Sequence, residues 1–205
     1  DGIHERIAVF DLYFRKMPFN SGYAVFNGLK RVVNFIENFG FTNEDITYLK
    51  SIGYEEDFLN YLKDLKFTGN IKSMQEGEIC FGNEPLLRVE APLIQAQLIE
   101  TILLNIINFQ TLIATKASRI RQIATHDTLM EFGTRRAQEI DAALWGARAA
   151  FIGGFDSTSN VRAGKLFNIP VSGTHAHALV QTYGDEYIAF KKYAERHKNC
   201  VFLVD

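Results

Sequence analysis

The stretch LMEFGTRRAQEIDAALWGARAAFIGGFDSTSNVRAGKLFNIPVSGTHAHALV, residues 129–180, decides the fold, because strand-like and helical patterns alternate along it. The alternation continues to the end of the chain. We expect strands at 129–132, 150–153, 169–172 and 200–204, and helices at 134–148, 157–167 and 176–197, the last broken at Gly184. Such alternation is typical of parallel βα units. Four strands are too few to close a βα barrel, which takes about eight.

The preceding residues show other patterns. Apolar residues at helical spacing predict helices, and short apolar runs between glycines predict antiparallel strands. We expect a strand at 7–14, helices at 24–39 and 55–65, a short helix capped by Thr42 with Asp45 in its first turn, and three short strands within 67–92. Pro92 suits the first turn of a long helix that continues to about Ile123.

That long helix is mostly apolar, but four polar residues interrupt it between residues 98 and 114. We therefore interpret it as a buried helix of a soluble protein, not as a membrane span. The sequence thus predicts an α/β fold with two parts. The first, residues 1–126, ends with the long helix, and the second, 127–205, is the beginning of a parallel α/β barrel.

Composition excludes several classes of protein. The formal net charge of −2 gives neither the basic surface of a nucleic-acid-binding protein nor a polybasic membrane patch. Cys80 and Cys200 lack the spacing of a metal site or a disulfide framework, so we expect reduced thiols. The first residues, DGIHERIAVF, do not form a secretion signal. These observations predict a cytoplasmic protein.

Three polar, glycine-containing clusters lie where a predicted strand meets a helix: 131–136, 153–160 and 172–177. In βα folds the carboxyl ends of the strands form the active site. Glycine lets the backbone approach a ligand, and a helix N-terminus favours anions. Arg135 and Arg136 carry the sign of charge that a helix N-terminus disfavours, and this favours an anionic ligand there.

Each cluster also has a purely structural interpretation. Thr134 is a plausible helix cap, and we prefer capping for Asp156, Ser157 and Ser159 when that cluster is taken alone. His175 and His177 share one face if a strand continues through them, and such a pair can bind a metal. Neither a cysteine nor a third histidine lies nearby to complete a ligand set, so we expect no metal site.

Taken together and in order, four blocks resemble the nicotinate phosphoribosyltransferase family: MPFNSGYAVFNGL at 17–29, LIETILLNIINFQTLIATKASRI at 98–120, EFGTRRAQ at 131–138, and GGFDSTSNVRAGKLFNIPVSGTHAHALV at 153–180. The resemblance covers nearly the whole chain. It implies a sandwich-like α/β N-terminal domain followed by part of an irregular α/β barrel, usually in a homodimer that shares its active sites between subunits.

The resemblance also implies a reaction. In that family the ring nitrogen of nicotinate attacks C1 of phosphoribosyl pyrophosphate, which forms nicotinate mononucleotide and releases pyrophosphate at the entry to NAD synthesis. Many members couple this step to ATP hydrolysis through a transient phosphohistidine, and Mg²⁺ accompanies the phosphates.

Six residues match family positions. Phe132 corresponds to the aromatic residue that stacks on the pyridine ring, and Arg135 to a residue at the ribose-phosphate end of the site. Thr174 corresponds to a position near nicotinate, and Ser159 and Asn160 to the polar loop facing the base. His177 corresponds to the phosphorylated histidine, with His175 as the alternative, or as a packed histidine.

The chain also departs from the family. The Asp11-Leu12-Tyr13 run is followed by FRKMPF, which belongs to a later family strand, so the stacking role of a family tyrosine is not assigned to Tyr13. Family members also continue well past CVFLVD at 200–205. The alternatives are a nicotinamide or quinolinate phosphoribosyltransferase, an inactive fragment of the family, and a metal hydrolase using His175 and His177.

Overall fold

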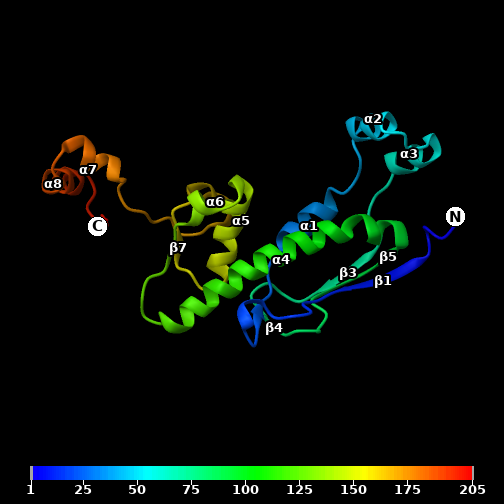
Figure 1. Cartoon of the computed structure of the whole chain (residues 1–205), viewed down its shortest axis with the longest axis horizontal. Coiled ribbons are helices and arrows are strands. Elements are labelled where there is room, and N and C mark those ends of the chain that lie inside the picture. Colours follow the sequence, from blue (N-terminus) through cyan, green and yellow to red (C-terminus); the bar gives the residue numbers. More distant parts are fainter. Residues whose placement is uncertain (1, 205) are drawn as a thin grey trace.

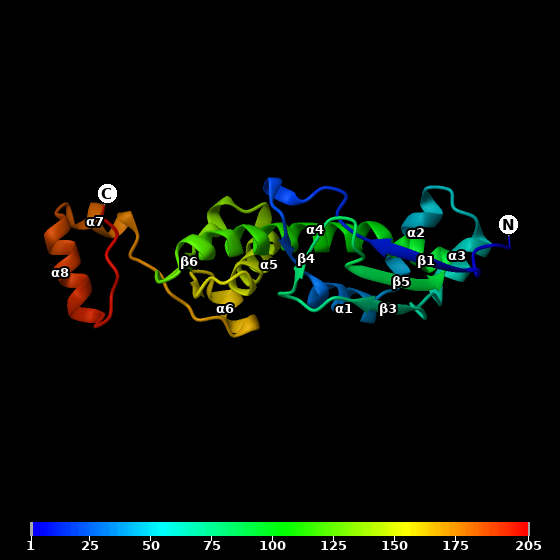
Figure 2. The same cartoon turned by 90° about the horizontal axis from the view of Figure 1, so that it is seen from below.

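A computed structural model describes residues 2–204 and shows an elongated mixed α/β molecule with its termini at opposite ends (Figures 1 and 2). The first part contains strands β1 (Ile7–Leu12), β2 (Ala24–Val25), β3 (Asn70–Ser73), β4 (Ile79–Cys80) and β5 (Leu87–Pro92), the short 3-10 helix η1 (Pro18–Asn20), and helices α1 (Leu29–Glu37), α2 (Asn43–Ser51), α3 (Glu56–Lys63) and α4 (Leu93–Ile123). The second part contains strands β6 (Met130–Glu131) and β7 (Ser157–Thr158), the 3-10 helix η2 (Gly133–Arg136), and helices α5 (Glu139–Ile152), α6 (Val161–Phe167), α7 (His177–Tyr183) and α8 (Glu186–Arg196).

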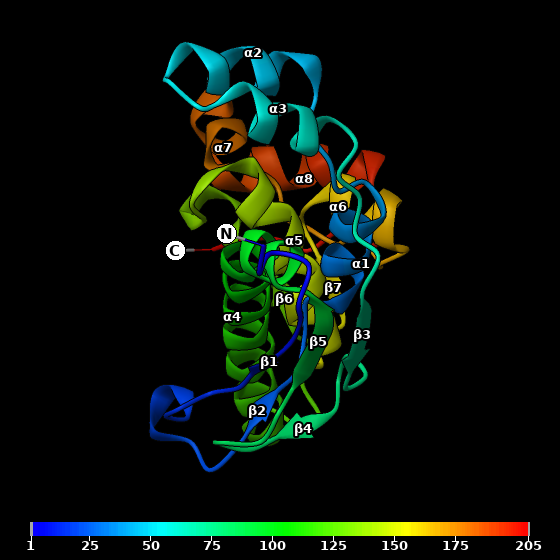
Figure 3. The ribbon, with the colours of Figure 1, turned by 90° about the vertical axis from the view of Figure 1, so that its right-hand side faces the viewer.

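The first part, which we call the N-terminal layer (β1 to α4), is built on an antiparallel sheet of order β1-β5-β3. Val89 pairs with Phe10 on one side and Ile71 on the other. Alternate residues of β5 are buried, as expected for a strand with one face on a core. The sheet lies along the N-terminal half of α4, as the view in Figure 3 shows. A separate two-stranded ladder joins β2 to β4.

The core of the N-terminal layer consists mainly of large apolar side chains, from helices α1 to α4, from β5 and from the loops beside them. Its fully buried members include Phe26, Leu59, Leu62, Leu86, Leu87, Ile99 and Ile107. Thr42 and Asp45 form the predicted capping box of α2, in which each side chain accepts a hydrogen bond from the other residue's backbone N–H. Gly28 precedes α1 with φ of 111°, a conformation that residues with a Cβ atom rarely adopt.

Polar contacts attach the loop from β2 to α1 to the long helix. The backbone N–H groups of Val25 and Asn27 donate to the hydroxyls of Thr115 and Thr111, at 2.9 and 3.1 Å. These threonines are four residues apart, so they lie on one face of α4. Both are fully buried. Buried backbone groups require such partners, and the two hydroxyls supply them.

A largely buried ion pair joins the N-terminal layer to α5. Arg148 donates to both carboxylate oxygens of Glu76, at 2.9 and 2.6 Å, and Glu76 also accepts the backbone N–H of Gly28 at 2.9 Å. Burial acts to raise the pKa of Glu76, but the hydrogen bonds and charge of Arg148 outweigh it and hold that pKa below its ordinary value. One carboxylate therefore caps α1 and fixes α5.

The second part begins with very short parallel pairing. Met130 and Glu131 of β6 pair with Ser157 and Thr158 of β7, and Thr158 forms a parallel bridge with Val171. Three chain segments thus run side by side in one direction, as parallel βα units predict, but the middle one is β7 and not the predicted strand at 150–153. The predicted α/β class is confirmed. The division at residues 126 and 127 stays an interpretation, because α4 packs on the sheet of the first part and also on α5.

Several predicted elements were wrong. Residues 150–153 are not a strand, because α5 continues to Ile152; the run is alanine-rich and packs on α4, a setting that suits a helix. The helix predicted from residue 157 begins at Val161, after β7. The helix predicted from residue 24 begins at Leu29, after β2. Residues 201–204 form no strand, and residue 205 lies outside the described residues.

The long helix α4 is only partly buried. One face carries the buried residues, whereas Leu98, Ile102, Leu104 and Ile120 on the rest of its surface are more than a third exposed. Among residues 2–204 it is the one helix long and apolar enough to cross a membrane, with 44% of its most apolar window buried. A core helix passes the same test, so length and composition here do not indicate a membrane span.

Candidate active site at the carboxyl ends of the parallel strands

The three predicted polar clusters lie at three neighbouring parallel segments: 131–136 begins at the end of β6, 153–160 contains β7, and 172–177 follows Val171. The second cluster was predicted to follow a strand at 150–153, but it follows α5 and its strand lies inside it. Backbone hydrogen bonds hold these segments together, since Ser159 N donates to Glu131 O at 3.0 Å and Ser172 N to Thr158 O at 3.1 Å. The residues after Glu131, Thr158 and Val171 therefore leave the sheet at the same edge. This arrangement is the one in which βα folds place their active sites.

Glu131, the last residue of β6, makes two side-chain contacts at this edge. Its carboxylate accepts the hydroxyl hydrogen of Thr158 at 2.6 Å and the backbone N–H of Gly133. Thr158 is fully buried, and its Oγ1 also accepts the backbone N–H of Asn160 at 3.0 Å. The network joins the ends of β6 and β7. Sequence analysis placed Glu131 in a cluster but gave it no role.

Asn160 caps α6, with its Oδ1 accepting the backbone N–H of Ala163 at 3.0 Å. Its Nδ2 lies 3.5 Å from the hydroxyl of Thr134, so it also faces the first cluster. The cluster therefore does cap the next helix, as its structural interpretation predicted. The predicted residues were wrong, because Asn160 caps α6 and Asp156, Ser157 and Ser159 do not. Thr134 lies within η2 and makes no cap hydrogen bond at α5.

Asp156 instead binds the end of α4. Its carboxylate accepts a hydrogen bond from the Arg121 guanidinium at 2.5 Å and one from the backbone N–H of Leu129 at 2.7 Å. Both hydrogen bonds lower the pKa of the Asp156 carboxyl, and the one from Leu129 contributes more. Arg121 also donates to the carbonyl oxygens of Gly154, Ala124 and Asp127, at 2.8–2.9 Å. Arg121 therefore fixes the start of β6. No local sequence pattern points to Arg121 beyond its place near the end of a predicted helix.

A hollow of about 520 Å³ lies between the first and second clusters. Its lining residues come from η2, the start of α5 and the start of α6, and they are Thr134, Ala137, Glu139, Ile140, Ala143, Leu144, Ser159, Asn160, Val161 and Arg162. Three of these, Thr134, Ser159 and Asn160, belong to the predicted clusters. The structure thus brings the polar loop residues Ser159 and Asn160 together with the η2 turn.

Phe132 directly follows β6, and Arg135 lies in the next turn, η2. The Phe132 side chain is 44% exposed, a high value for a large aromatic residue. Arg135 and Arg136 are exposed in η2, and within residues 2–204 neither guanidinium has a hydrogen bond or ion pair. An exposed aromatic ring beside two cations suits a planar anionic ligand.

The third cluster divides in two. Thr174 is half-buried in the extended link after Val171, whereas His177 begins α7 and is exposed. Figures 1 and 2 show α7 and α8 apart from α5 and α6. The structure therefore does not bring His177 together with Phe132, Arg135, Ser159 and Asn160.

His175 is packed. Its ring lies 4.9 Å from that of Phe190, and its Nε2 accepts the backbone N–H of Leu203 at 3.1 Å. This assigns the proton to Nδ1, which lies 3.3 Å from the carbonyl oxygen of Ala176. A histidine with both nitrogens engaged does not support the metal-hydrolase alternative. No group of three or more His, Cys, Asp or Glu suited to a metal ion occurs among the residues that the structure describes.

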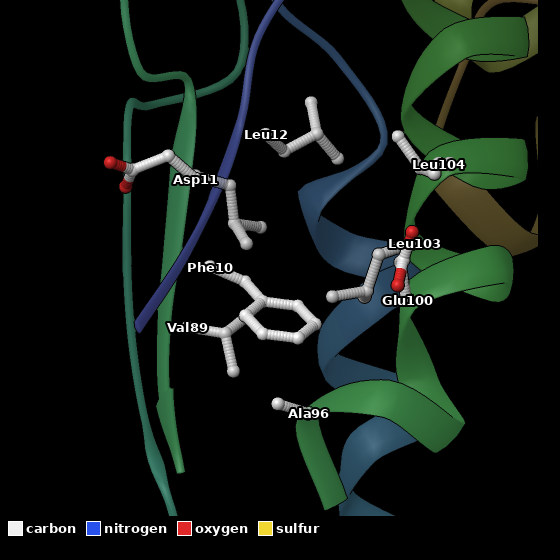
Figure 4. A pocket seen from close by; sticks show the side chains of 9 residues that line it. Phe10, Asp11, Leu12, Val89, Ala96, Glu100, Leu103 and Leu104 are labelled. Atoms are coloured by element: carbon white, nitrogen blue, oxygen red, sulfur yellow. The ribbon is translucent and has the colours of Figure 1, made fainter. Parts of the chain in front are cut away.

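A second cavity, of about 220 Å³, lies between the sheet and α4 (Figure 4). It is lined mainly by apolar residues, among them Phe10, Leu12 and Leu103, together with Asp11 and Glu100. Asp11 is already bound by Arg88, with both contacts at 2.7 Å. The Asp11 carboxylate points away from the cavity toward solvent (Figure 4), so the space itself is apolar apart from Glu100. Its lining residues include no cation that could bind an anionic ligand, so it is not the candidate site.

Both the sequence and the overall fold are similar to those of known proteins. The family model described as the nicotinate phosphoribosyltransferase N-terminal domain matches residues 1–108. The nicotinate phosphoribosyltransferase of Bacillus subtilis (strain 168) is 66% identical over 206 residues, which is 100% of this chain and 42% of that protein. That of Caenorhabditis elegans is 44% identical, over 89% of this chain and 33% of that protein.

Two solved structures are also similar. The crystal structure of human nicotinic acid phosphoribosyltransferase superposes with a TM-score of 0.83 at 38% identity, covering 88% of this chain and 37% of that one. The nicotinate-nucleotide pyrophosphorylase of Pyrococcus furiosus gives 0.75 at 26% identity, covering 96% and 43%. This chain spans less than half the length of each of these relatives. With its fold, its polar strand ends and the matched domain, the chain belongs to the nicotinate phosphoribosyltransferase family.

Proposed function

We propose that this chain supplies the N-terminal layer and the first strand ends of an enzyme that forms nicotinate mononucleotide and pyrophosphate from nicotinate and phosphoribosyl pyrophosphate. The observation that supports this most is the placement of the polar clusters at one edge of three parallel segments. A Bacillus subtilis relative that bears this enzyme name, at 66% identity, gives the substrate class.

The residues at that edge suit the reaction. Nicotinate's ring nitrogen attacks C1 of the sugar while pyrophosphate departs, so the enzyme must align two anions and neutralise the leaving group. Phe132 offers its exposed ring to the pyridine ring, and Arg135 its exposed guanidinium to the ribose phosphate. An offset ring pair contributes about 0.5–1.5 kcal/mol beyond burial. Thr174, Ser159 and Asn160 would form the polar side of the nicotinate site.

His177 is our proposal for the histidine that ATP phosphorylates. It lies at the first position of α7 and is accessible to a phosphate donor. Neutral imidazole is a competent nucleophile near neutral pH. Because α7 lies apart from the η2 turn in this structure, the proposed cycle requires α7 to approach the strand ends when the site is complete.

Mg²⁺ fits this site only as a companion of the phosphates. It is usually held by one or two carboxylates and by substrate phosphates, with several waters. The described residues offer no cluster of three ligands, so their contribution would be to bind and orient the phosphate groups. We also propose, from the family, a cytoplasmic homodimer that shares its active sites, with no nucleic-acid or membrane partner.

The decisive experiment replaces the matching 206 residues of the Bacillus subtilis relative with this chain and measures nicotinate mononucleotide formation with Mg²⁺ and ATP. We expect activity in the chimera and its loss with His177→Ala, whereas the 205-residue chain alone tests the inactive-fragment alternative. Competition with nicotinamide and quinolinate tests the other substrates. A folded chimera that turns over quinolinate or nicotinamide but not nicotinate would sink the nicotinate assignment.

A further inference from the structure

Glu131 is the residue through which this structure holds the substrate-facing turn. Its backbone ends β6, and the next residues are Phe132 and η2. One carboxylate oxygen accepts Gly133 N–H, inside that turn, and the other accepts the hydroxyl of Thr158 on the neighbouring strand. The side chain therefore connects the turn to β7 and to the strand that carries it.

Thr158 makes this connection specific. It is fully buried, and its hydroxyl donates to Glu131 while accepting the N–H of Asn160. Asn160 in turn caps α6 and faces Thr134. A hydroxyl has one hydrogen to donate, and Asn160 N–H occupies one of its acceptor positions. The network thus fixes the direction of the hydroxyl, and Glu131 must present an acceptor to it.

The turn has few other attachments. Phe132 is nearly half exposed, and among the described residues no hydrogen bond or ion pair holds the guanidinium of Arg135. A site residue displaced by about 1 Å can lose a large part of its effect on the reaction. The geometry of Phe132 and Arg135 therefore depends on the carboxylate that anchors Gly133.

We propose that Glu131, acting through Thr158, is a positioning residue that sets the placement of Phe132 and Arg135 toward both substrates. This inference rests on the proposed function for its substrates, but the anchoring of the turn is a property of the chain itself. Glu131 is not a catalytic residue in this proposal, because its two carboxylate oxygens are already occupied by the protein.

The first test uses the 205-residue chain and hydrogen exchange at the amides of Gly133 and Asn160. Glu131→Gln replaces one acceptor oxygen with a donor NH₂, and Thr158→Val removes the hydroxyl while keeping its shape. We expect exchange at the Gly133 amide to become about tenfold faster in Glu131→Gln, because its hydrogen bond to a charged carboxylate is lost. We expect a similar increase at the Asn160 amide in Thr158→Val, because its hydrogen bond to the buried hydroxyl is lost. Glu90→Gln, on the exposed face of β5, is the matched control.

The second test measures steady-state kinetics in the chimera. We expect KM for nicotinate and for phosphoribosyl pyrophosphate to rise together by about tenfold in Glu131→Gln and Thr158→Val, with Thr158→Ser regaining most of the loss. A purely structural role would lower the thermal midpoint and the active fraction while leaving both KM values unchanged, and would overturn the proposal. If the wild-type chimera forms no product, the proposed function fails, and unchanged exchange at Gly133 would then overturn the positioning role separately.

Discussion

The N-terminal layer and the segment that carries the site are stabilised in different ways. β1 and β5 pair over six residues, and the core between them and α4 contains large side chains such as Phe26, Leu62 and Ile107. β6 and β7 pair over only two residues. Between residues 143 and 163 the buried apolar side chains are those of five alanines and one leucine, Leu144. The comparison shows that apolar burial orders the first region, whereas small-residue packing and polar ties order the second.

The physical reason lies in what the second region must expose. In the proposed function its strand ends present backbone and polar side chains to the substrates, so large apolar residues cannot cover them. Arg121 with Asp156 and Arg148 with Glu76 attach this region to the N-terminal layer instead. If this is so, removing these ion pairs or the small-residue packing should lower the free energy of unfolding more than removing exposed contacts of the N-terminal layer does.

The largest effect is expected from Arg148→Ala, which leaves the Glu76 carboxylate without its cation. The two side chains are only 12% and 16% exposed, so we expect the free energy of unfolding to fall by about 3–5 kcal/mol, measured by urea denaturation. Lys50→Ala is the control, because its pair with Glu56 is largely exposed and should cost under about 1 kcal/mol. Equal losses in the two variants would show that Arg148–Glu76 does not join the regions.

Gly153→Ala tests the small-residue packing of α5 on α4. A Cβ at residue 153 would lie 2.4 Å from the carbonyl oxygen of Ala114, which is backbone and cannot move aside cheaply. We expect a loss of about 1–3 kcal/mol. Gly146→Ala, inside the helix that Gly153 caps at its C-terminus, is the control, since the nearest neighbour of its Cβ would be 3.6 Å away and alanine favours helix by about 0.5–1 kcal/mol. A loss in both variants would argue against close packing at Gly153 as the cause.

Acid should lower the free energy of unfolding by less than Arg148→Ala does, because a protonated Glu76 still accepts some of its hydrogen bonds. The folded-state pKa of Glu76 lies below its ordinary value of 4.5, so its stabilisation is complete above that pH and is lost as pH falls through the folded-state pKa. Unfolding free energies between pH 6 and 3 should therefore fall less steeply in Glu76→Gln than in the unaltered chain. Parallel curves would contradict this.

Thr42→Ala should have the smallest effect and should leave the second region unchanged. It removes the side chain that accepts Asp45 N–H in the capping box of α2, at a cost of about 1 kcal/mol. Thr47→Ala is the control, because that hydroxyl only bonds back to Asn43 O within the helix. Equal thermal midpoints in the two variants would show that the Thr42 cap does not stabilise α2.

The site could be predicted only as far as its residues are local in sequence. Ser159 and Asn160 line the same hollow as Thr134, as expected for clusters at neighbouring strands, although the second strand is β7 and not residues 150–153. The capping residue was missed because Asp156 and Asn160 are both suitable caps, and only the position of Arg121 decides that Asp156 turns toward α4. The predicted strand at 150–153 was wrong because a short apolar run fits a strand or a buried helix equally well.

The sequence by itself determined the α/β class, the capping box at Thr42, the long helix and the order of the polar clusters, because periodicity, capping and turn residues act between neighbours in the chain. The tertiary structure alone decided that Glu131 meets Thr158, that Glu76 meets Arg148, and that His175 is packed while His177 begins a helix set apart from the strand ends. Such contacts join residues far apart in sequence, so they depend on which surfaces pack together and not on any local pattern.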